Sequence, residues 1–389
     1  MTAPRQDPLR DPRFFADPYP TYDRLREGCP VQRIPTGSGG HHAYLITGHR
    51  EAREAFTDPR LSKDTARFFA DRPSQRDLHP AISRNMLASD PPAHTRHRRV
   101  ATRLFTTGRV RELRPFITRV VDDLTATWQP GTDIDLVADL AIPLPVTVVC
   151  ELLGVPAADR ASLAAWSHDL FDATDTARID AASHRIGDYL TDMIDGSPDH
   201  WFVRDCAAGG LDRDETVSLA ALLLVAGHET TTHFIGNAVL ALLRNPEAFD
   251  RLVRDPDLIP GALDELLRFD SPISVATFRH STQDLRVGDT DIPAGYPVLI
   301  SPGAANRDPS RFPDPNRLDL DRDASAHLSF GHGIHRCPGA PLARAEAEIT
   351  LRTLLTRFPN TRLTIPPHSL PWRPTRLTHG LTTLPLTLA

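Results

Sequence analysis

The sequence is nearly devoid of lysine. Lys63 is the only lysine among 44 basic residues, so almost all positive charge comes from arginine, and no functional conclusion follows from that bias. Positive charge is not in excess either, because 50 acidic residues leave a formal charge of −6. This balance gives no overall case for nucleic acid as a partner.

Cysteine and long apolar runs are scarce as well. The four cysteines lie far apart without Cys-x-x-Cys spacing, which indicates reduced thiols of a cytoplasmic protein rather than a disulfide framework. Residues 1–13 contain no apolar core of a signal peptide. The longest strongly apolar run, 219–226, is too short to cross a bilayer. We therefore expect a cytoplasmic protein with no membrane segment.

The 36 prolines separate apolar periodic segments rather than form one tract. Apolar residues at helical spacing predict helices over 120–153, 158–194 and 217–243. Strand composition is confined to short segments near 43–47, 284–300 and the C-terminus. With no internal repeat and no linker, the 389 residues predict one domain, 1–389, that is mainly α with small β-sheets.

The most informative stretch is residues 329–340, Ser-Phe-Gly-His-Gly-Ile-His-Arg-Cys-Pro-Gly-Ala. Gly331 and Gly333 allow positive φ angles and let the main chain lie close against a flat group. Pro338 is preset for a first helical turn. Cys337 should therefore lie where free N–H groups and the helix dipole favour a thiolate. Such a thiolate can be an axial ligand of haem iron.

Three other interpretations of this stretch are open. Cys337 could be a buried structural thiol, or part of a zinc site with His332 and His335, or the glycines could form a phosphate loop. No second Cys/His pair follows at zinc-finger spacing, and the third glycine and preceding apolar strand of a phosphate loop are missing.

The full pattern, Phe-Gly-x-Gly-x-His-x-Cys-x-Gly, resembles the haem-ligand loop of the cytochrome P450 family. The resemblance implies that Cys337 binds the haem iron. It also implies a set of cofactor-binding residues around that cysteine, namely Phe330, Gly331, His335 and Gly339.

Two further segments contain residues that could bind the cofactor. His94 and Arg98 are spaced i, i+4 after Asp-Pro-Pro, so both can reach one anion, although a solvated basic helix start would show the same spacing. Asp-Pro-Pro-x-His-Thr-Arg-x-Arg-Arg is similar to the family's helix at the haem edge, which implies that both residues bind a propionate. Residues 273–279 resemble the family's strand that lines the pocket, which implies that Arg279 reaches a propionate.

The apolar helix 217–243 is interrupted by Ala226-Gly-His-Glu-Thr-Thr. A buried acid is costly unless it is used or paired, and Thr230 can bond the Ala226 carbonyl and open the helix locally. A small-residue packing contact beside a surface acid is the alternative. The pattern resembles the family's oxygen-activation groove, which implies that Ala226 borders the cofactor and that Glu229 and Thr230 relay protons.

Glu265 and Arg268 are spaced i, i+3, which by itself describes an ordinary ion pair. Together with Asn-Arg-Asp-Pro at 306–309 and Phe-Pro-Asp-Pro at 312–315, the pair resembles the family's buried scaffold. The resemblance implies a further arginine from the meander, the segment that follows. We expect it within residues 311–317, and rank Arg317 and Arg322 as the weaker candidates.

The resemblance extends over about residues 11–388 and implies a bacterial haem-thiolate monooxygenase with haem b (iron protoporphyrin IX). Such an enzyme takes electrons from a ferredoxin and its ferredoxin reductase, and uses O₂ to hydroxylate, epoxidise or oxidatively couple a hydrophobic small molecule of natural-product biosynthesis. A peroxygenase using hydrogen peroxide, an auxiliary protein without chemistry, and a zinc or structural protein are the alternatives.

Two sets of surroundings complete the expectation. The resemblance implies a substrate pocket formed by Met86, Leu87, Val225, Ala226, Ile273, Val275 and Leu381. The ferredoxin should dock on arginines near the cysteine, namely Arg98, Arg99, Arg103, Arg109, Arg111, Arg336 and Arg344, unless these merely form a solvated helix face.

Overall fold

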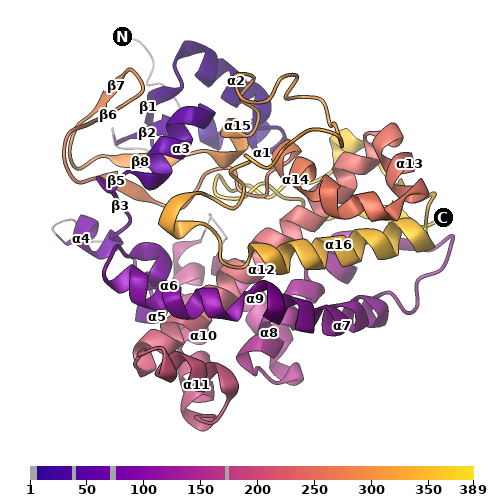
Figure 1. Cartoon of the computed structure of the whole chain (residues 1–389), viewed down its shortest axis with the longest axis horizontal. Coiled ribbons are helices and arrows are strands. Elements are labelled where there is room, and N and C mark those ends of the chain that lie inside the picture. Colours follow the sequence, from indigo (N-terminus) through magenta and orange to yellow (C-terminus); the bar gives the residue numbers. More distant parts are fainter. Residues whose placement is uncertain (1–6, 37–40, 71–75, 171–174) are drawn as a thin grey trace.

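The longest helix, α12 (Arg213–Leu243), passes through the middle of the molecule and organises the other helices around it (Figure 1). The computed structural model describes residues 7–36, 41–70, 76–170 and 175–389. A capping box starts α12, since Asp212 Oδ1 accepts the Glu215 N–H at 2.9 Å and Glu215 Oε2 accepts the Asp212 N–H at 3.1 Å. Because α12 packs against α5, α8, α10 and α16, it is apolar on all sides rather than amphipathic.

The remaining helices fall into an N-terminal, a central and a C-terminal group. The N-terminal group comprises α1 (Pro12–Ala16), α2 (Tyr19–Gly28), α3 (His49–Thr57), α4 (Thr65–Phe69), α5 (Pro80–Ser83) and α6 (Ala93–Leu104). The central group comprises α7 (Thr107–Leu124), α8 (Pro143–Leu153), α9 (Arg160–Leu170), α10 (Thr176–Gly196) and α11 (Trp201–Ala208). After α12 follow α13 (Pro246–Arg254), α14 (Ile259–Phe269), α15 (Pro302–Ala305) and α16 (Ala340–Arg357).

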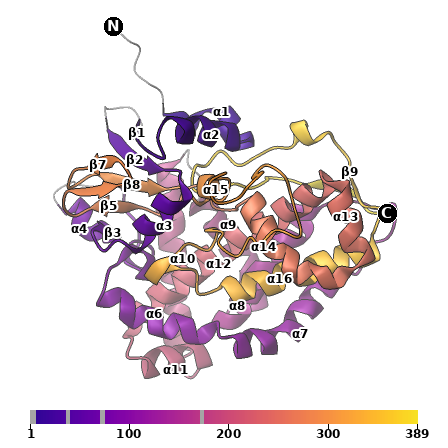
Figure 2. The same cartoon turned by 45° about the horizontal axis from the view of Figure 1, so that its top comes forward.

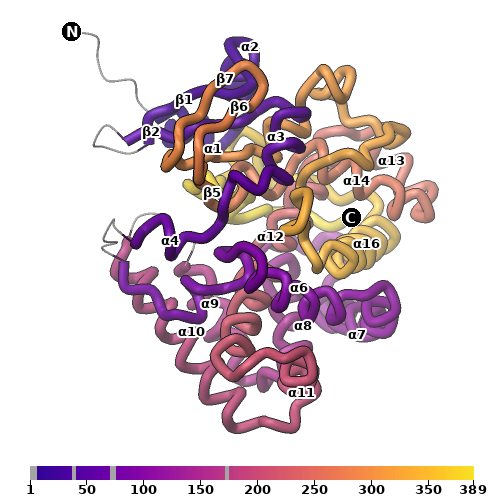
Figure 3. The backbone as a smooth tube through the Cα atoms, turned by 60° about the vertical axis from the view of Figure 1, so that its left-hand side comes forward, coloured from indigo at the N-terminus to yellow at the C-terminus, as the bar shows by residue number. Residues whose placement is uncertain are grey.

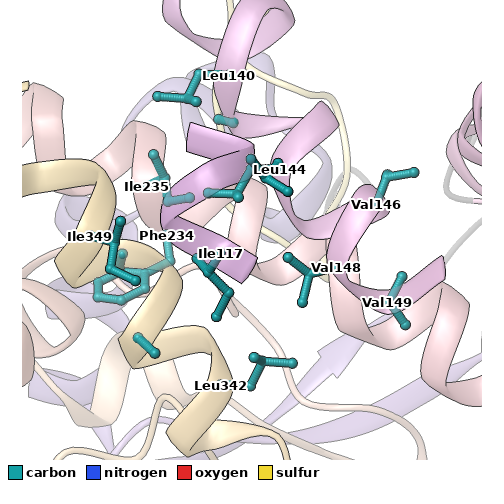
Figure 4. Close-up of a cluster of buried hydrophobic side chains, with 14 of the residues drawn as sticks. Ile117, Leu140, Leu144, Val146, Val148, Val149, Phe234, Ile235, Leu342 and Ile349 are labelled. Atoms are coloured by element: carbon teal, nitrogen blue, oxygen red, sulfur yellow. The ribbon is translucent and has the colours of Figure 1, made fainter. Parts of the chain in front are cut away.

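The main hydrophobic core lies where α7, α8, α12 and α16 meet (Figure 4). Ile117 of α7, Val148 of α8, Phe234 of α12 and Ile349 of α16 are all buried there. α7 contributes an apolar face at helical spacing, which is the feature that sequence periodicity detects, whereas α12 is apolar around its whole circumference.

The five-stranded sheet and the β6–β7 pair lie on one side of the helical body, whereas β9 of the third sheet lies on the other side, near α13 (Figures 2 and 3). One sheet has the order β1-β2-β8-β5-β3 and only the β2–β8 pair is parallel. Smaller sheets have the orders β4-β10-β9 and β6-β7. The strands are β1 (Val31–Pro35), β2 (His42–Ile46), β3 (Leu61–Ser62), β4 (Asp133–Asp135), β5 (Arg279–Ser281), β6 (Leu285–Val287), β7 (Thr290–Ile292), β8 (Pro297–Ile300), β9 (Arg362–Leu363) and β10 (Pro385–Thr387).

Three local expectations were wrong. The segment 273–279 is not a continuous strand, because β5 begins only at Arg279 and Ile273 forms a single bridge with Thr378. The segment 120–153 is not all helical: a turn, β4 and a short π-helix (Val137–Ala141) separate α7 from α8. Pro338 does not begin the last long helix, which starts at Ala340 after a turn through Pro338 and Gly339. Pairing with distant segments accounts for the first two differences, since Ile273 bridges Thr378 and β4 pairs with β10.

None of the helices in the described part of the chain combines the length and apolarity that a bilayer crossing requires.

Candidate active site

A large cavity lies between α12 and the loop before α16, with a volume of about 1460 Å³ including its open mouth. It gathers every cofactor-binding residue expected from the sequence. Its wall includes His94, Arg98, Ala226, Arg279, Phe330, Gly331, His335, Cys337 and Gly339. These residues come from α6, α12, β5 and the loop before α16, so the fold joins segments more than 200 residues apart in the chain.

The loop that carries Cys337 is shaped by its backbone. The Cys337 N–H donates to the Phe330 carbonyl at 2.8 Å, which closes the loop on itself. Gly333 has φ +73°, and a Cβ there would lie 2.9 Å from the Phe56 carbonyl oxygen, so a side chain would need the backbone to move. The positive φ angles expected for the glycines are present, since Gly331 has φ +69°.

Two opposing effects act on the pKa of the Cys337 thiol. Burial raises the pKa of the thiol, while N–H groups of Gly339 and Ala340 and the charges of Arg98 and Arg336 lower it. A cationic metal at the sulfur would favour the thiolate further. Among the described residues, no three His, Cys, Asp or Glu side chains are grouped as ligands of a metal ion.

A cluster of basic side chains occupies one part of the cavity wall. The rings of His94 and His335 lie 4.2 Å apart between centroids, and neither ring nitrogen of the buried His94 has a hydrogen-bond partner among the described residues. Burial, reinforced by Lys63 and His94, lowers the pKa of His335 to about 2, so its ring is neutral. Burial also lowers the pKa of Arg279 to about 10. The cluster has the composition of a site for carboxylates.

On α12, small residues expose the backbone to the cavity. Ala226 and Gly227 are accessible although the helix around them is buried. Thr230 Oγ1 donates to the Ala226 carbonyl at 3.1 Å, as expected from the sequence. Thr230 lines the cavity, so its hydroxyl lies at the wall where a bound molecule would meet α12.

Glu229 lies on another side of α12 and lines a smaller, neighbouring cavity. Arg373 Nη1 donates to both carboxylate oxygens, at 2.9 and 3.1 Å. His233 Nε2 lies 3.3 Å from Oε2, and the half-exposed His168 lies 3.7 Å from Oε1. Burial by itself raises the pKa of Glu229, but His233, His228 and Arg373 outweigh burial and lower it to about 2. Glu229 is therefore a carboxylate at neutral pH.

The scaffold pair forms beneath the cavity. Arg268 is fully buried and bonds Glu265 through Nε at 2.6 Å and Nη2 at 2.8 Å. Arg268 also donates to the carbonyls of Asn306 and Pro315. The meander arginine is Arg322, whose Nε lies 3.3 Å from Glu265 Oε1, so the expectation of a partner within 311–317 was wrong. The 319–322 turn brings Arg322 back to α14, and no local pattern indicates that return.

The residues expected to form the substrate pocket divide into two groups. Met86, Leu87, Ala226 and Ile273 line the large cavity. Val225 packs against the helical core, Val275 is buried in a separate core near α1 and α2, and Leu381 lines the smaller cavity. Further cavity residues were missed by the sequence analysis, namely Phe56, Lys63, Phe105, Val149, Leu222, Leu223, Thr277 and Glu346. Of these residues, only Lys63 carries a signal in the sequence, because it is the only lysine of the chain.

The arginines near the cysteine are not equally available. Arg99, Arg103, Arg111 and Arg336 are exposed. Arg109 pairs with Asp205 at 3.1 Å and lies over the Trp201 ring, and Arg344 pairs with Asp264.

A cysteine-centred cavity next to a small-residue stretch of a central helix, with basic side chains gathered on its wall, is typical of a haem-thiolate protein. The cytochrome P450 family model matches residues 174–387. The chain is 41% identical over 391 residues to cytochrome P450 107B1 of Saccharopolyspora erythraea, covering 97% of this chain and 96% of that protein. It is 41% identical over 384 residues to the cytochrome P450 monooxygenase PikC of Streptomyces venezuelae, covering 96% and 91%.

A solved structure agrees with these relatives. The tirandamycin C-bound P450 monooxygenase TamI superposes with a TM-score of 0.89 at 40% identity, covering 97% of this chain and 99% of that one. The chain therefore belongs to the cytochrome P450 family, and it is a haem monooxygenase that oxidises a hydrophobic small molecule in natural-product biosynthesis.

Proposed function

We propose that Cys337 is the axial ligand of haem b and that the remainder of the large cavity binds an apolar natural product. The observation that carries the assignment is the Cys337 sulfur facing the cavity, with the N–H groups of Gly339 and Ala340 directed at it. When bound, the haem supplies O₂ activation, which the thiolate promotes by donating electron density. Cys337 is the only cysteine among the cavity residues, which fits a haem held without thioether links.

The basic cluster fits the two propionates of such a haem. His94, Arg98, Arg279 and His335 line the cavity, and within the part of the chain that the structure describes, both ring nitrogens of the buried His94 lack a partner. Buried donors without acceptors are costly, so an anion at this place would satisfy them. We assign these four residues to the propionates.

Thr230 and Glu229 are proposed as the proton-relay pair. The Thr230 hydroxyl, held at the Ala226 carbonyl, stands at the cavity wall and can pass a proton to a group bound there. Glu229 faces the smaller cavity, where the half-exposed His168 gives contact with solvent. A proton route from solvent would pass His168 and Glu229 before reaching Thr230. Arg373 holds Glu229 ionised, so delivery requires that ion pair to loosen.

The cavity wall is mainly apolar outside the basic cluster, with Thr230, Thr231, Thr277, Ser329 and Glu346 as its other polar residues besides Cys337. It includes Met86, Leu87, Val149, Leu222, Leu223 and Ile273. These side chains favour a bulky hydrophobic molecule and offer few polar groups to orient it. Hydroxylation, epoxidation and oxidative coupling are all compatible with this wall.

We further propose a ferredoxin and its ferredoxin reductase as the electron donors, acting with this enzyme in the cytoplasm. The exposed arginines of α6, α7 and the cysteine loop provide positive charge beside Cys337 on an otherwise acidic protein. A small acidic iron–sulfur protein is complementary to such a surface.

Replacement of the cysteine tests the assignment. Cys337→Ser should remove the Soret band that the reduced, CO-bound protein shows when the ligand is thiolate, and O₂-dependent turnover with it. The matched control is Cys29→Ser, a partly buried cysteine outside the cavity, which should keep both. Full activity of the Cys337 variant would refute the proposed site.

A further inference from the structure

The only lysine of the chain is buried beside the proposed propionate cluster. Lys63 follows β3 and is 2% exposed, whereas lysines are almost never buried unless paired. Its backbone N–H donates to Asp90 Oδ1 at 3.1 Å, and its Nζ donates to the Thr277 hydroxyl. One neutral acceptor is a poor match for an ammonium with three N–H donors.

The nearby carboxylate is already engaged. Asp90 accepts the Lys63 N–H through one oxygen and the Ser62 hydroxyl through the other. The residues that act electrostatically on Lys63 are Arg279, which repels it, and Asp90, which attracts it. Burial lowers the pKa of Lys63 well below its ordinary value, and the charge of Arg279 lowers it further.

The charges of the cluster are unbalanced within the protein. Lys63, Arg98, Arg279 and the two histidines all border the cavity, and each of the other four acts on the pKa of His335. Across the described residues, Asp90 is the single acid that acts on Lys63 and Arg279. The histidines add no charge when neutral, but Arg98, Arg279 and a charged Lys63 on one wall require more negative charge than one carboxylate provides.

We propose that Lys63 is a fifth propionate-binding residue, whose ammonium binds the carboxylate that Arg279 also binds, positioned by Thr277. This inference rests on the proposed haem site. Thr277 serves both cations, because its hydroxyl accepts from Lys63 and its carbonyl accepts from Arg279 Nη1 at 3.5 Å. Lys63 and Thr277 are 214 positions apart, so the contact joins the β3 segment to the substrate wall around Ile273.

Two consequences distinguish this role from simple packing. The negative propionate should raise the pKa of Lys63 and keep it an ammonium at neutral pH, opposite to the effect of burial alone. Its positive charge beside the haem should in turn raise the reduction potential, because reduction adds an electron near a cation.

The first experiment compares charge removal at two positions of the holoenzyme. Lys63→Met keeps the apolar stem, and Arg67→Met removes the same charge from an exposed position on α4. Haem transfer to excess apomyoglobin should be at least about tenfold faster for the Lys63 variant, as expected for loss of a hydrogen bond to a charged group. Its reduction potential should be more negative. The Arg67 variant should match the wild type, and Thr277→Val should lie between them.

The second experiment uses the wild type and so does not depend on a variant folding. Because the chain has one lysine, [ζ-¹⁵N]lysine labelling gives a single side-chain resonance in the reduced, CO-bound protein. An ammonium that persists to pH 9 supports the assignment, and a neutral amine at pH 7 overturns it. Wild-type haem transfer by the Lys63 variant also overturns it while leaving the haem-thiolate site intact. A wild type without the thiolate CO band would refute the proposed site as well.

Discussion

At the scale of single residues, two neighbours on one helix serve different cavities. Thr230 lines the large cavity and Glu229 lines the smaller one, because adjacent helical positions point about 100° apart. The motif indicates only that an acid and an alcohol are adjacent. The ion pair between Glu229 and Arg373 depends on the C-terminal segment returning to α12.

Removal of the Thr230 hydroxyl should separate electron use from product formation. Thr230→Ala leaves the cavity wall apolar and should bind substrate nearly as well, while more of the NAD(P)H consumed appears as hydrogen peroxide. The measurement is peroxide and product formed per NAD(P)H in a reconstituted system. Thr230→Ser, which keeps the hydroxyl, should restore coupling. Unchanged coupling in the alanine variant would count against Thr230 as a relay residue.

Glu346 is a buried acid of α16 with no partner for its Oε2 among the described residues. Burial raises the pKa of Glu346 to about 8, above its ordinary value of 4.5. The folded protein therefore holds this proton more tightly than the unfolded chain. The stability that the proton provides is fully present below pH 4.5 and is lost as the pH rises to 8.

The pH dependence of unfolding should reveal this group. Between pH 5 and 8, the wild type should lose up to about 1.4 kcal/mol of unfolding free energy per pH unit relative to Glu346→Gln. Urea unfolding at several pH values measures the difference. Glu348→Gln, two residues along α16 at a carboxylate held by Arg114, should not change the slope. Parallel curves for wild type and Glu346→Gln would show that Glu346 does not titrate in this range.

At the scale of elements, buried hydrogen bonds and ion pairs hold α14 against the segment 306–322. Arg268 is 0% exposed, and Glu265, Asn306 and Pro315 accept its N–H groups. Arg322 adds a second cation at Glu265. An ion pair of this kind holds segments in place rather than adding much net stability, because desolvation offsets attraction. Loss of one partner, however, leaves a buried charge unsatisfied.

Arg268→Met should therefore destabilise the fold by about 3–5 kcal/mol. Arg251→Met provides the control, since Arg251 makes a similar bidentate pair with Asp321 at the surface. Exposed pairs are worth about 0–1 kcal/mol, so that variant should be nearly neutral. Urea unfolding of the two proteins decides the matter. Equal effects would mean that burial does not amplify the Arg268 contacts.

At the scale of the whole molecule, charge is distributed unevenly. The net charge is −6, yet Arg99, Arg103, Arg111 and Arg336 are exposed on α6, α7 and the cysteine loop. Arg109 and Arg344 are already neutralised by Asp205 and Asp264, so they are poor sites to test docking.

Arg103→Glu should slow reduction by ferredoxin by about tenfold at low salt, because opposed charges accelerate encounter and like charges oppose it. The difference should shrink as ionic strength rises. Reduction by dithionite should be unchanged. Arg362→Glu on β9, which lies far from α6 in Figure 2, makes the same charge change elsewhere and should have no effect. Salt-independent reduction of all three proteins would exclude electrostatic docking here.

The sequence by itself determined the family, the mainly helical fold and the residues whose roles depend on near neighbours. Cys337 with its glycines, Thr230 with the Ala226 carbonyl, and the Glu265–Arg268 pair all involve residues within seven positions, so their spacing is visible in the chain. Apolar periodicity likewise revealed the long helices, because burial of one face is a local pattern.

Only the tertiary structure decided which distant groups meet. Lys63 reaches Thr277 across 214 positions, and Arg322 reaches Glu265 across 57. The tertiary structure also places Val275 and Leu381 outside the large cavity, although both are apolar like the residues that line it. Such contacts have no fixed sequence separation, because the folded path of the intervening chain decides which distant residues meet. A lone lysine can thus be seen in the sequence, but the Thr277 hydroxyl that its side chain bonds is found only through the fold.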